Sequence, residues 1–122
     1  MTRGKSIERA SSTLKRVGQV PLADLHEKGC VRLMYPPFHV LVCLVDGYVY
    51  AIEDACNHAG ASLSKGSIEG PCVTCPLHGY VFDVRTGELL IPEGLCDAQR
   101  TFVVDVVGPT VTVWDPVRLM IQ

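Results

Sequence analysis

DACNHAGASLSKG at residues 54–66 and VTCPLHGYVFD at residues 73–83 are two stretches that each carry one cysteine and one histidine. In the first, one residue separates Cys56 from His58, and in the second, two residues separate Cys75 from His78. Cysteine as thiolate and histidine as neutral imidazole are the side chains that best bind borderline and soft metals. The four residues therefore form a candidate metal site shared by two separated segments.

Two kinds of metal site could use two cysteines and two histidines. A mononuclear zinc site would take all four ligands tetrahedrally, although zinc fingers usually place both cysteines in one segment and both histidines in another. A 2Fe–2S cluster of mixed ligation needs two thiolates on one iron and two imidazoles on the other. Two facing loops can meet that need when each supplies one cysteine and one histidine. The spacing favours the cluster, with a zinc-binding structural module as an alternative.

The segments around these two stretches have the patterns of short β-strands. Residues 38–54, FHVLVCLVDGYVYAIED, contain two apolar runs joined by Asp46-Gly47, a strong hairpin signal. Two further turns are predicted at Thr86-Gly87 and at Gly108-Pro109. Residues 20–29, VPLADLHEKG, carry the only hint of a helix. We expect an all-β fold of eight to ten short strands, with both candidate ligand segments in loops.

Over residues 17–115 the chain resembles the Rieske family. The resemblance rests on CNHAGASLSKG, on the sixteen residues between His58 and Cys75, and on CPLHGYVFDVRTG. It implies an antiparallel β-sandwich with a cluster-binding subdomain formed by two loops. It also implies one Rieske-type 2Fe–2S cluster, with Cys56 and Cys75 on one iron and His58 and His78 on the other.

The resemblance extends to residues that would surround the cluster. We expect the glycines to permit turns or close backbone approach and to aim amide groups at the sulfides. We expect the apolar side chains to shield the cluster from water. The candidates are Gly60, Leu63, Gly66, Pro76, Leu77, Gly79 and Tyr80.

Four positions distinguish this chain from the Rieske proteins of respiratory and photosynthetic complexes. Those relatives have a second cysteine in each loop, where this chain has Ala61 and Leu77, so the disulfide between those positions is absent here. They also have a serine and a tyrosine that donate hydrogen bonds to sulfur, where this chain has Tyr80 and Phe82. Without those two donors, we expect a potential toward the lower end of the range of roughly −150 to +300 mV for such centres.

The function that the resemblance implies is that of a soluble one-electron carrier, not an enzyme. Such a carrier takes electrons from a flavin reductase and passes them to a terminal oxygenase. The chain is too short to hold the catalytic domain of an oxygenase. An alternative is the small subunit of a nitrite-reductase-type complex, with a structural or regulatory role.

The composition and charge of the chain limit its partners. It is 48% hydrophobic with eleven glycines and eight prolines, which is typical of a globular protein, and 122 residues allow one domain. Residues 1–16 hold five basic residues and one glutamate, whereas the remaining chain holds six basic and twelve acidic residues. We expect a flexible basic tail over residues 1–16, a Rieske domain over residues 17–122, and no nucleic-acid or membrane partner.

The start of the chain has no apolar segment of the kind found in signal peptides, so we expect a cytoplasmic protein. Organellar import stays open, because the tail is rich in serine and arginine as transit peptides are. In a chain that is not secreted, the six cysteines are expected to be metal ligands or buried thiols rather than disulfides.

The remaining cysteines, histidines and other notable residues are given structural roles. Cys72 forms a C-x-x-C pattern with Cys75, but its apolar surroundings favour a thiol in the core. The other expectations are buried strand positions for Cys30 and Cys43, an unactivated thiol at Cys96, surface positions for His26 and His39, packing for Trp114 and a turn for Asp54.

Overall fold

The computed structural model describes residues 14–57 and 60–116, and almost every regular element within them is an antiparallel strand. The elements are β1 (Lys15–Pro21), α1 (Leu22–Lys28), β2 (Cys30–Leu33), β3 (Val40–Val45), β4 (Tyr48–Glu53), η2 (Leu63–Lys65), β5 (Ser67–Glu69), β6 (Cys72–Thr74), β7 (Val81–Asp83), β8 (Leu89–Ile91), β9 (Val103–Val107) and β10 (Thr110–Asp115). The strand orders of the three sheets are β1-β10-β9, β2-β3-β4 and β5-β6-β7-β8. This confirms the all-β fold.

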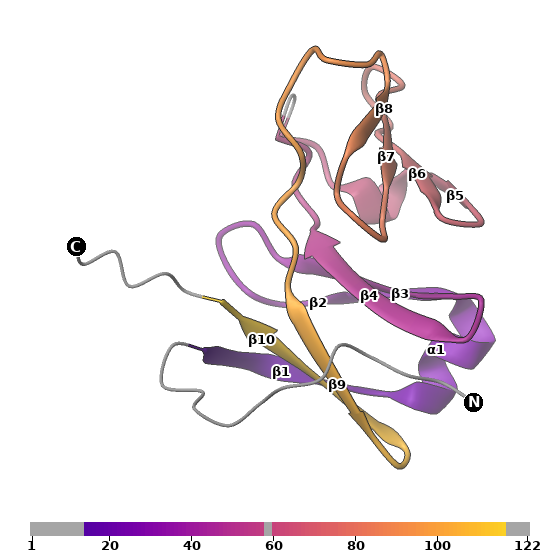
Figure 1. Cartoon of the computed structure of the whole chain (residues 1–122), viewed down its shortest axis with the longest axis vertical. Helices are drawn as coiled ribbons and strands as arrows, with labels where there is room; N and C mark the ends of the chain where they lie inside the picture. Colours follow the sequence, from indigo (N-terminus) through magenta and orange to yellow (C-terminus); the bar gives the residue numbers. More distant parts are fainter. Residues whose placement is uncertain (1–13, 58–59, 117–122) are drawn as a thin grey trace.

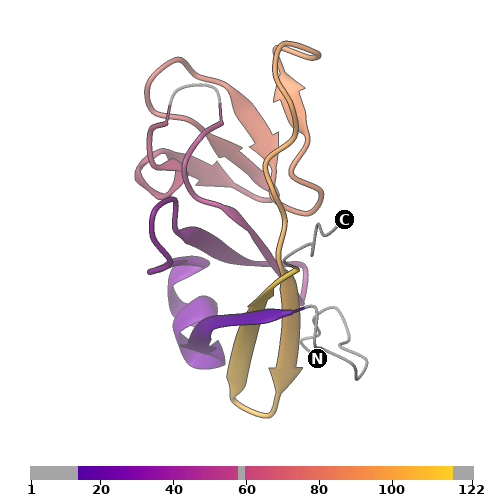
Figure 2. The ribbon, with the colours of Figure 1, turned by 90° about the vertical axis from the view of Figure 1, so that its left-hand side faces the viewer.

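Three layers make up the molecule, as Figures 1 and 2 show from two sides. The sheet β1-β10-β9 lies at the bottom, the sheet β2-β3-β4 lies in the middle, and the sheet β5-β6-β7-β8 forms a smaller subdomain at the top. The helix α1 lies at one end of the two lower layers. The lower two sheets form the predicted sandwich, and the top layer contains the candidate ligand segments.

Strand β3 is buried on both faces because it lies in the middle layer. Val40 and Val42 point into a core shared with the bottom sheet, whereas Leu41 and Cys43 point into a second core shared with the top subdomain. Side chains alternate between the faces of a strand, so a continuous apolar run suits a strand that is covered on both sides. The run VLVCLV therefore gives β3 an apolar face on each side, and the smaller subdomain packs against one of them.

The local turn signals are confirmed. Asp46 and Gly47 both have positive φ, at 53° and 85°, and they connect β3 to β4, as a two-residue hairpin turn requires. Gly87 lies in the turn between β7 and β8, and Gly108 begins the turn between β9 and β10. The predicted helical segment is α1, a helix of seven residues.

Cys30 and Cys43 are joined by a disulfide, so the prediction of two separate buried thiols is wrong. The two residues face each other directly in the register of β2 and β3, with their Cα atoms 4.1 Å apart. Directly opposed residues in an antiparallel pair come closest at the positions without mutual hydrogen bonds. The pairing depends on a register between two strands, which the spacing of cysteines along the chain does not reveal.

The last two residues of the predicted tail over residues 1–16 lie in a strand. Strand β1 begins at Lys15, so Lys15 and Arg16 belong to the bottom sheet rather than to a tail. The other residues of the predicted tail and the candidate ligand His58 lie outside the described residues. None of the helices in the described part of the chain is long and apolar enough to cross a membrane.

Candidate metal centre

Cys56 lies at the start of a loop that its own backbone closes. The amide of Cys56 donates a hydrogen bond to the carbonyl oxygen of Ala61 at 2.8 Å, and its carbonyl oxygen accepts one from the amide of Gly60 at 2.6 Å. Gly60 has a φ of 75°, a conformation that glycine adopts with little strain. These two hydrogen bonds hold Gly60 and Ala61 against the backbone of Cys56.

Cys75 begins a second loop with the same pattern. Its amide donates to the carbonyl oxygen of Tyr80 at 2.7 Å, and its carbonyl oxygen accepts from the amide of Gly79 at 3.1 Å. The φ of Gly79 is 74°, nearly that of Gly60. The two candidate cysteines therefore occupy equivalent positions, each with a glycine four residues later and the same pair of closing hydrogen bonds.

The two loops hold their candidate ligands at different depths. Cys56 and Cys75 are each only 1% exposed, and they share a core with Leu63 and Phe82. His78 is exposed at the surface of the second loop. A buried pair of thiolates with an exposed imidazole suits a bound group that has one sheltered end and one end facing the solvent.

Gly66 brings the end of the first loop against the start of the second. A side chain at this position would overlap the carbonyl oxygen of Thr74 and would lie 3.2 Å from the ring of Pro76. These two residues flank Cys75 in the sequence. The close approach predicted for Gly66 is confirmed, and it fixes the spacing of the two loops.

The amides of the three loop glycines are bonded within the backbone. The N–H of Gly60 donates to Cys56, that of Gly66 to Leu63, and that of Gly79 to Cys75, in each case to the carbonyl oxygen. They close turns of the backbone, as expected for these glycines. Their contribution to the site is to shape the loops.

Asp54 does more than form the turn expected from the sequence. Its carboxylate is 1% exposed and accepts hydrogen bonds from Arg32 Nε at 3.1 Å, from the amide of Ser64 at 2.8 Å, and from the hydroxyl of Ser62. A buried carboxylate is tolerated when charged and polar donors surround it. Asp54 therefore ties the outgoing and returning limbs of the first loop to strand β2.

The predicted surroundings of the cluster lie at different depths. Leu63 is fully buried beside the two cysteines, and Tyr80 is partly buried against the same core. Pro76 is exposed, and Leu77 is 58% exposed. Of the side chains expected to shield the cluster, Leu63 is thus the buried one, whereas Leu77 adds exposed apolar surface next to His78 in the chain.

The donor set suits a cluster of mixed ligation. Such a 2Fe–2S cluster takes two thiolates and two imidazoles. Cys56, Cys75 and His78, which all lie among the described residues, would supply three of these four groups. Within residues 14–57 and 60–116, no group of three or more His, Cys, Asp or Glu side chains is placed to hold a metal ion.

The remaining cysteines and histidines lie away from this arrangement or carry no sign of activation. Cys72 faces Asp83 across β6 and β7 and forms no disulfide with Cys75. Burial, with a smaller effect from Asp97, raises the pKa of the Cys96 thiol, which leaves less thiolate. His26 lies in α1, and the imidazole of His39 accepts a hydrogen bond from the amide of Tyr35.

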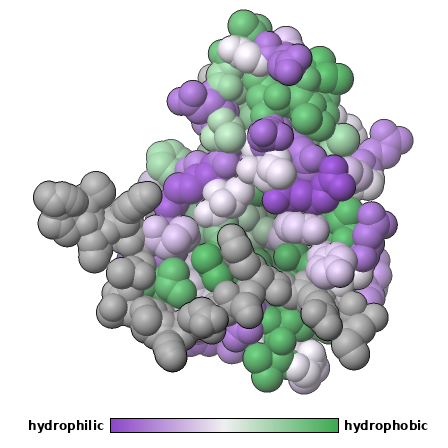
Figure 3. All heavy atoms as spheres, in the orientation of Figure 1, coloured by the Kyte–Doolittle hydropathy of each residue, from purple (hydrophilic) through white to green (hydrophobic). Residues whose placement is uncertain are grey.

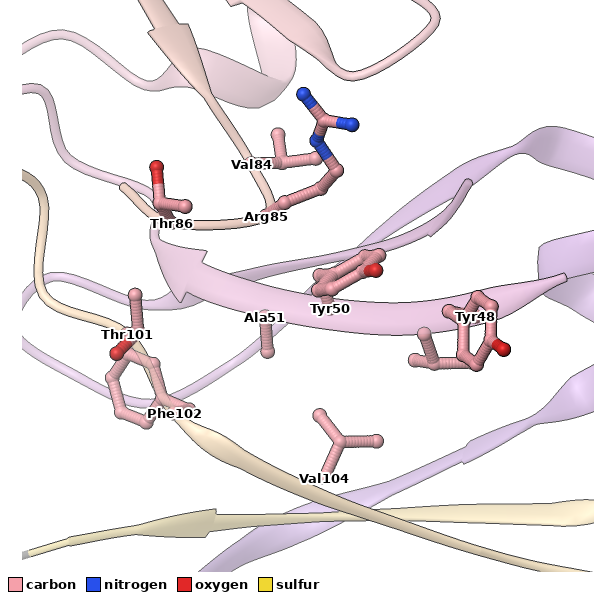
Figure 4. A pocket seen from close by; sticks show the side chains of 10 residues that line it. Tyr48, Tyr50, Ala51, Val84, Arg85, Thr86, Thr101, Phe102 and Val104 are labelled. Atoms are coloured by element: carbon pink, nitrogen blue, oxygen red, sulfur yellow. The ribbon is translucent and has the colours of Figure 1, made fainter. Parts of the chain in front are cut away.

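A groove of about 360 Å³ is lined by residues of β4, of the turn after β7, and of β9 with the segment before it, and none of these residues comes from the candidate ligand loops. Tyr48 and Tyr50 of β4 line it together with Arg85 and Phe102 (Figure 4). The guanidinium of Arg85 is already held by Asp83, at 2.9 Å. The groove is therefore a separate feature from the candidate metal centre.

The chain matches the model of the Rieske [2Fe-2S] domain over residues 22–94. It is 41% identical over 91 residues to the ferredoxin component of biphenyl 2,3-dioxygenase from Rhodococcus jostii, a match that covers 74% of this chain and 83% of that protein. Residues 22–94, the range of the domain match, contain both candidate ligand loops and the strands next to them.

Solved structures agree with this match. The ferredoxin of carbazole 1,9a-dioxygenase from Nocardioides aromaticivorans has a TM-score of 0.71 at 30% identity and covers 81% of this chain and 96% of its own. A chain from a complex of reduced oxygenase and oxidized ferredoxin in carbazole 1,9a-dioxygenase has a TM-score of 0.71 at 29% identity, covering 88% and 97%.

A structure described as the small subunit of a putative NADPH nitrite reductase is also similar. Its TM-score is 0.62 at 25% identity, and the match covers 81% of this chain and 97% of that one. The same fold thus serves proteins of more than one described kind. On the domain match and the similarity to the biphenyl dioxygenase ferredoxin component, this chain belongs to the Rieske [2Fe–2S] family, whose cofactor is one [2Fe–2S] cluster.

Proposed function

We propose that Cys56 and Cys75 bind one iron of the cluster and that His58 and His78 bind the other. The observation that carries this assignment is the equivalence of the two loops, in which each buried cysteine is closed by the same hydrogen bonds. Each loop then supplies one thiolate and one imidazole, as the mixed ligation demands. The exposed position of His78 fits the outer iron.

The function that follows is transfer of one electron at a time from a reductase to an oxygenase. The cluster supplies a centre that accepts and releases a single electron. The protein binds that centre, keeps water from its thiolate end through Leu63 and Phe82, and exposes its histidine end. Similarity to ferredoxin components of dioxygenase systems supports a carrier role, so the chain itself transforms no substrate.

The surface around the exposed end suits brief contact with another protein. Leu77 is 58% exposed beside His78, and Figure 3 shows apolar side chains gathered at the top of the molecule. The other exposed large apolar residues in the described part of the top subdomain and the connection after it are Ile68, Leu90, Ile91 and Leu95. Weak electron-transfer complexes use small interfaces, so a compact apolar area near the histidine is sufficient.

Two properties accompany this proposal. Phe82 is fully buried and has no polar atom to donate to sulfur, which supports a potential at the low end of the class. We also propose a cytoplasmic location, where a reductase that uses a nicotinamide cofactor would operate.

The division into a basic N-terminal segment and a single domain remains a proposal, because residues 1–13 lie outside the described part of the chain.

The experiment that tests the carrier role is reconstitution with redox partners. A flavin reductase of a dioxygenase system, with NADH, should reduce this protein in a stopped-flow mixer, and a terminal oxygenase should then reoxidise it. Single turnover should oxidise one electron equivalent per chain. Failure of the protein to take electrons from every such reductase, while it is reduced by dithionite, would contradict the carrier role.

The second candidate is a subunit of a nitrite-reductase-type complex, favoured by the similarity to the structure described in those terms. A subunit with that role would copurify with a large catalytic subunit. A pull-down with the tagged protein from its own cells separates the two functions, because a transient carrier does not remain bound. A zinc-binding module, in turn, would be colourless, whereas a Rieske protein is red-brown.

A further inference from the structure

Gln99 is a buried polar side chain in a largely exposed connection between β8 and β9. The connection runs from the top subdomain down one side of the molecule to β9 (Figures 1 and 2). Gln99 is 2% exposed, whereas its neighbours Ala98 and Arg100 are exposed. Buried amides in native proteins are almost always hydrogen-bonded, so the partners of Gln99 show what it does.

The side-chain amide of Gln99 is bonded to three backbone groups around Cys56. Its Nε2 donates to the carbonyl oxygens of Glu53 at 2.8 Å and Ala55 at 2.9 Å. Its Oε1 accepts from the amide of Asn57 at 2.7 Å. These groups lie at alternate positions on both sides of Cys56. One glutamine side chain thus fixes the backbone just before and just after a proposed ligand.

The side chain of Asn57 is hydrogen-bonded to the same connection. Its Nδ2 donates to the carbonyl oxygens of Asp97 at 2.7 Å and Ala98 at 3.0 Å. Asn57 lies between the proposed ligands Cys56 and His58, so its position is coupled to both. Five hydrogen bonds therefore join the first ligand loop to the connection. Each of them links the side chain of Gln99 or Asn57 to a backbone group.

The backbone of Gln99 is fixed from the opposite side. Its amide donates to the carbonyl oxygen of Gly87 at 2.7 Å, and a side chain at position 87 would overlap the carbonyl oxygen of Gln99. Gly87 in turn donates to the carbonyl oxygen of Asp83, at the end of β7. Strand β7 is paired with β6, the strand that leads into Cys75. Gln99 therefore links the arm that carries Cys56 to the arm that carries Cys75.

We infer that Gln99 is a positioning residue that sets the distance and orientation of the two ligand arms and thereby tunes the cluster that they hold. This inference rests on the proposed ligand assignment. Hydrogen bonding and solvent access around a metal centre control its potential, so movement of the Cys56 arm changes both. Without their partner, these three part-buried backbone groups would favour an opened loop that admits water.

Two substitutions at this position test the inference. Gln99→Leu removes the three side-chain hydrogen bonds at similar volume. Gln99→Glu keeps an acceptor for the amide of Asn57 but places an oxygen against the carbonyl oxygens of Glu53 and Ala55, which repel it. The control is Gln19→Leu in β1, where the glutamine also donates a hydrogen bond, to Thr112 at 3.2 Å, but is exposed and belongs to the bottom sheet.

Four measurements are made on each protein: far-UV circular dichroism, EPR of the reduced state, the reduction potential and hydrogen exchange at the amide of Asn57. In Gln99→Leu, the fold is retained, the g-values and the potential move, and exchange at Asn57 becomes at least tenfold faster. Gln19→Leu matches the wild type in all four. Asn57→Ala removes the hydrogen bonds from Asn57 to Asp97 and Ala98 and moves the g-values in the same way. Combining it with Gln99→Leu changes the g-values little further, because both side chains stabilise the same contact.

Unchanged g-values and an unchanged potential in a folded Gln99→Leu protein overturn the inference. This holds even if its melting temperature falls, because Gln99 then affects only the stability of the fold. Unaccelerated exchange at Asn57 overturns it as well. If Gln99→Leu does not fold, Asn57→Ala decides with the same four measurements. A wild-type protein without an iron–sulfur EPR signal marks the failure of the proposed function instead, and the exchange at Asn57 still tests the contact itself.

Discussion

Gly60 and Gly79 occupy equivalent positions in the two ligand loops. Each lies four residues after a buried cysteine, donates its amide to that cysteine's carbonyl oxygen, and has a φ near 75°. The equivalence holds although the histidine follows the cysteine by two positions in one loop and by three in the other. The described parts of the two loops thus share one backbone frame.

The first prediction concerns the shared glycine position. Gly79→Ala forces an alanine into a conformation with positive φ, which costs on the order of 1–2 kcal/mol. We expect loosening of the second loop and faster loss of iron to a chelator. Gly94 is the matched control, because it has a φ of 80°, also has free space around it, and lies outside both ligand loops.

Gly94→Ala should lower the melting temperature by a similar amount while iron release stays at the wild-type rate. The measurement is release of iron to a coloured chelator at a temperature well below unfolding. Equal rates of release in the two variants would show that the glycine at position 79 has no special part in holding the cluster.

The second prediction concerns the buried Phe82. Phe82→Tyr restores a hydroxyl that can donate to sulfur, and one such bond of about 1–2 kcal/mol corresponds to a rise of roughly 40–90 mV for a one-electron couple. Phe102→Tyr is the control, since Phe102 is buried in the other core. Redox titration followed by EPR gives both potentials. A rise in the Phe102 variant alone, or in neither, argues against the assigned role of position 82.

The third prediction follows from the ion pair next to β7. Hydrogen bonds from the Arg85 side chain, opposed by burial, hold the pKa of Asp83 below its ordinary value of 3.8. A carboxyl with a lowered pKa in the folded state contributes stability above its unfolded pKa, and that contribution is lost as the pH falls through the folded value. Asp83→Asn should therefore melt several degrees lower than the wild type at pH 7.

The difference between the two proteins should remain constant down to about pH 4.5 and should vanish in more acidic solution, where the wild-type carboxyl is protonated as well. Thermal melts at a series of pH values provide the comparison. A difference that persists unchanged at pH 2.5 would indicate that the charge of Asp83 does not stabilise the fold.

The fourth prediction concerns the Cys30–Cys43 disulfide. The bond closes a loop of thirteen residues in sequence separation, and closing a loop of that size stabilises by about 3 kcal/mol in the chain-entropy model. We expect Cys30→Ala to melt clearly below the wild type. A phosphine reductant should lower the wild-type melting temperature and leave the variant unchanged. Cys72→Ser, at a cysteine without a disulfide, serves as the control and should respond to the reductant as the wild type does.

The sequence predicts the features that depend on neighbouring residues. The turn at Asp46 and Gly47 and the hint of a helix within residues 20–29 follow from local chemistry, and both are present, the helix as Leu22–Lys28. The family resemblance adds the two ligand loops because their motifs are contiguous. The close approach at Gly66 is also signalled, since a glycine at a fixed place in a motif often marks a backbone contact.

The features that the sequence does not predict depend on contacts between distant segments. The disulfide needs the register of β2 against β3, and the burial of Asp54 needs Arg32 on one side and Ser64 on the other. Gln99 has no motif at all, since its partners lie more than 40 residues earlier in the chain. No periodicity or propensity in the sequence brings these groups together.

The most direct test of the central claim is low-temperature EPR of anaerobically purified protein reduced with dithionite, together with iron and sulfide assays. Cluster ligation by two thiolates and two imidazoles predicts a rhombic signal with a low average g, and two irons and two sulfides per chain. A protein without that signal, or one that binds zinc stoichiometrically, would contradict the account and leave a structural subunit on a Rieske scaffold.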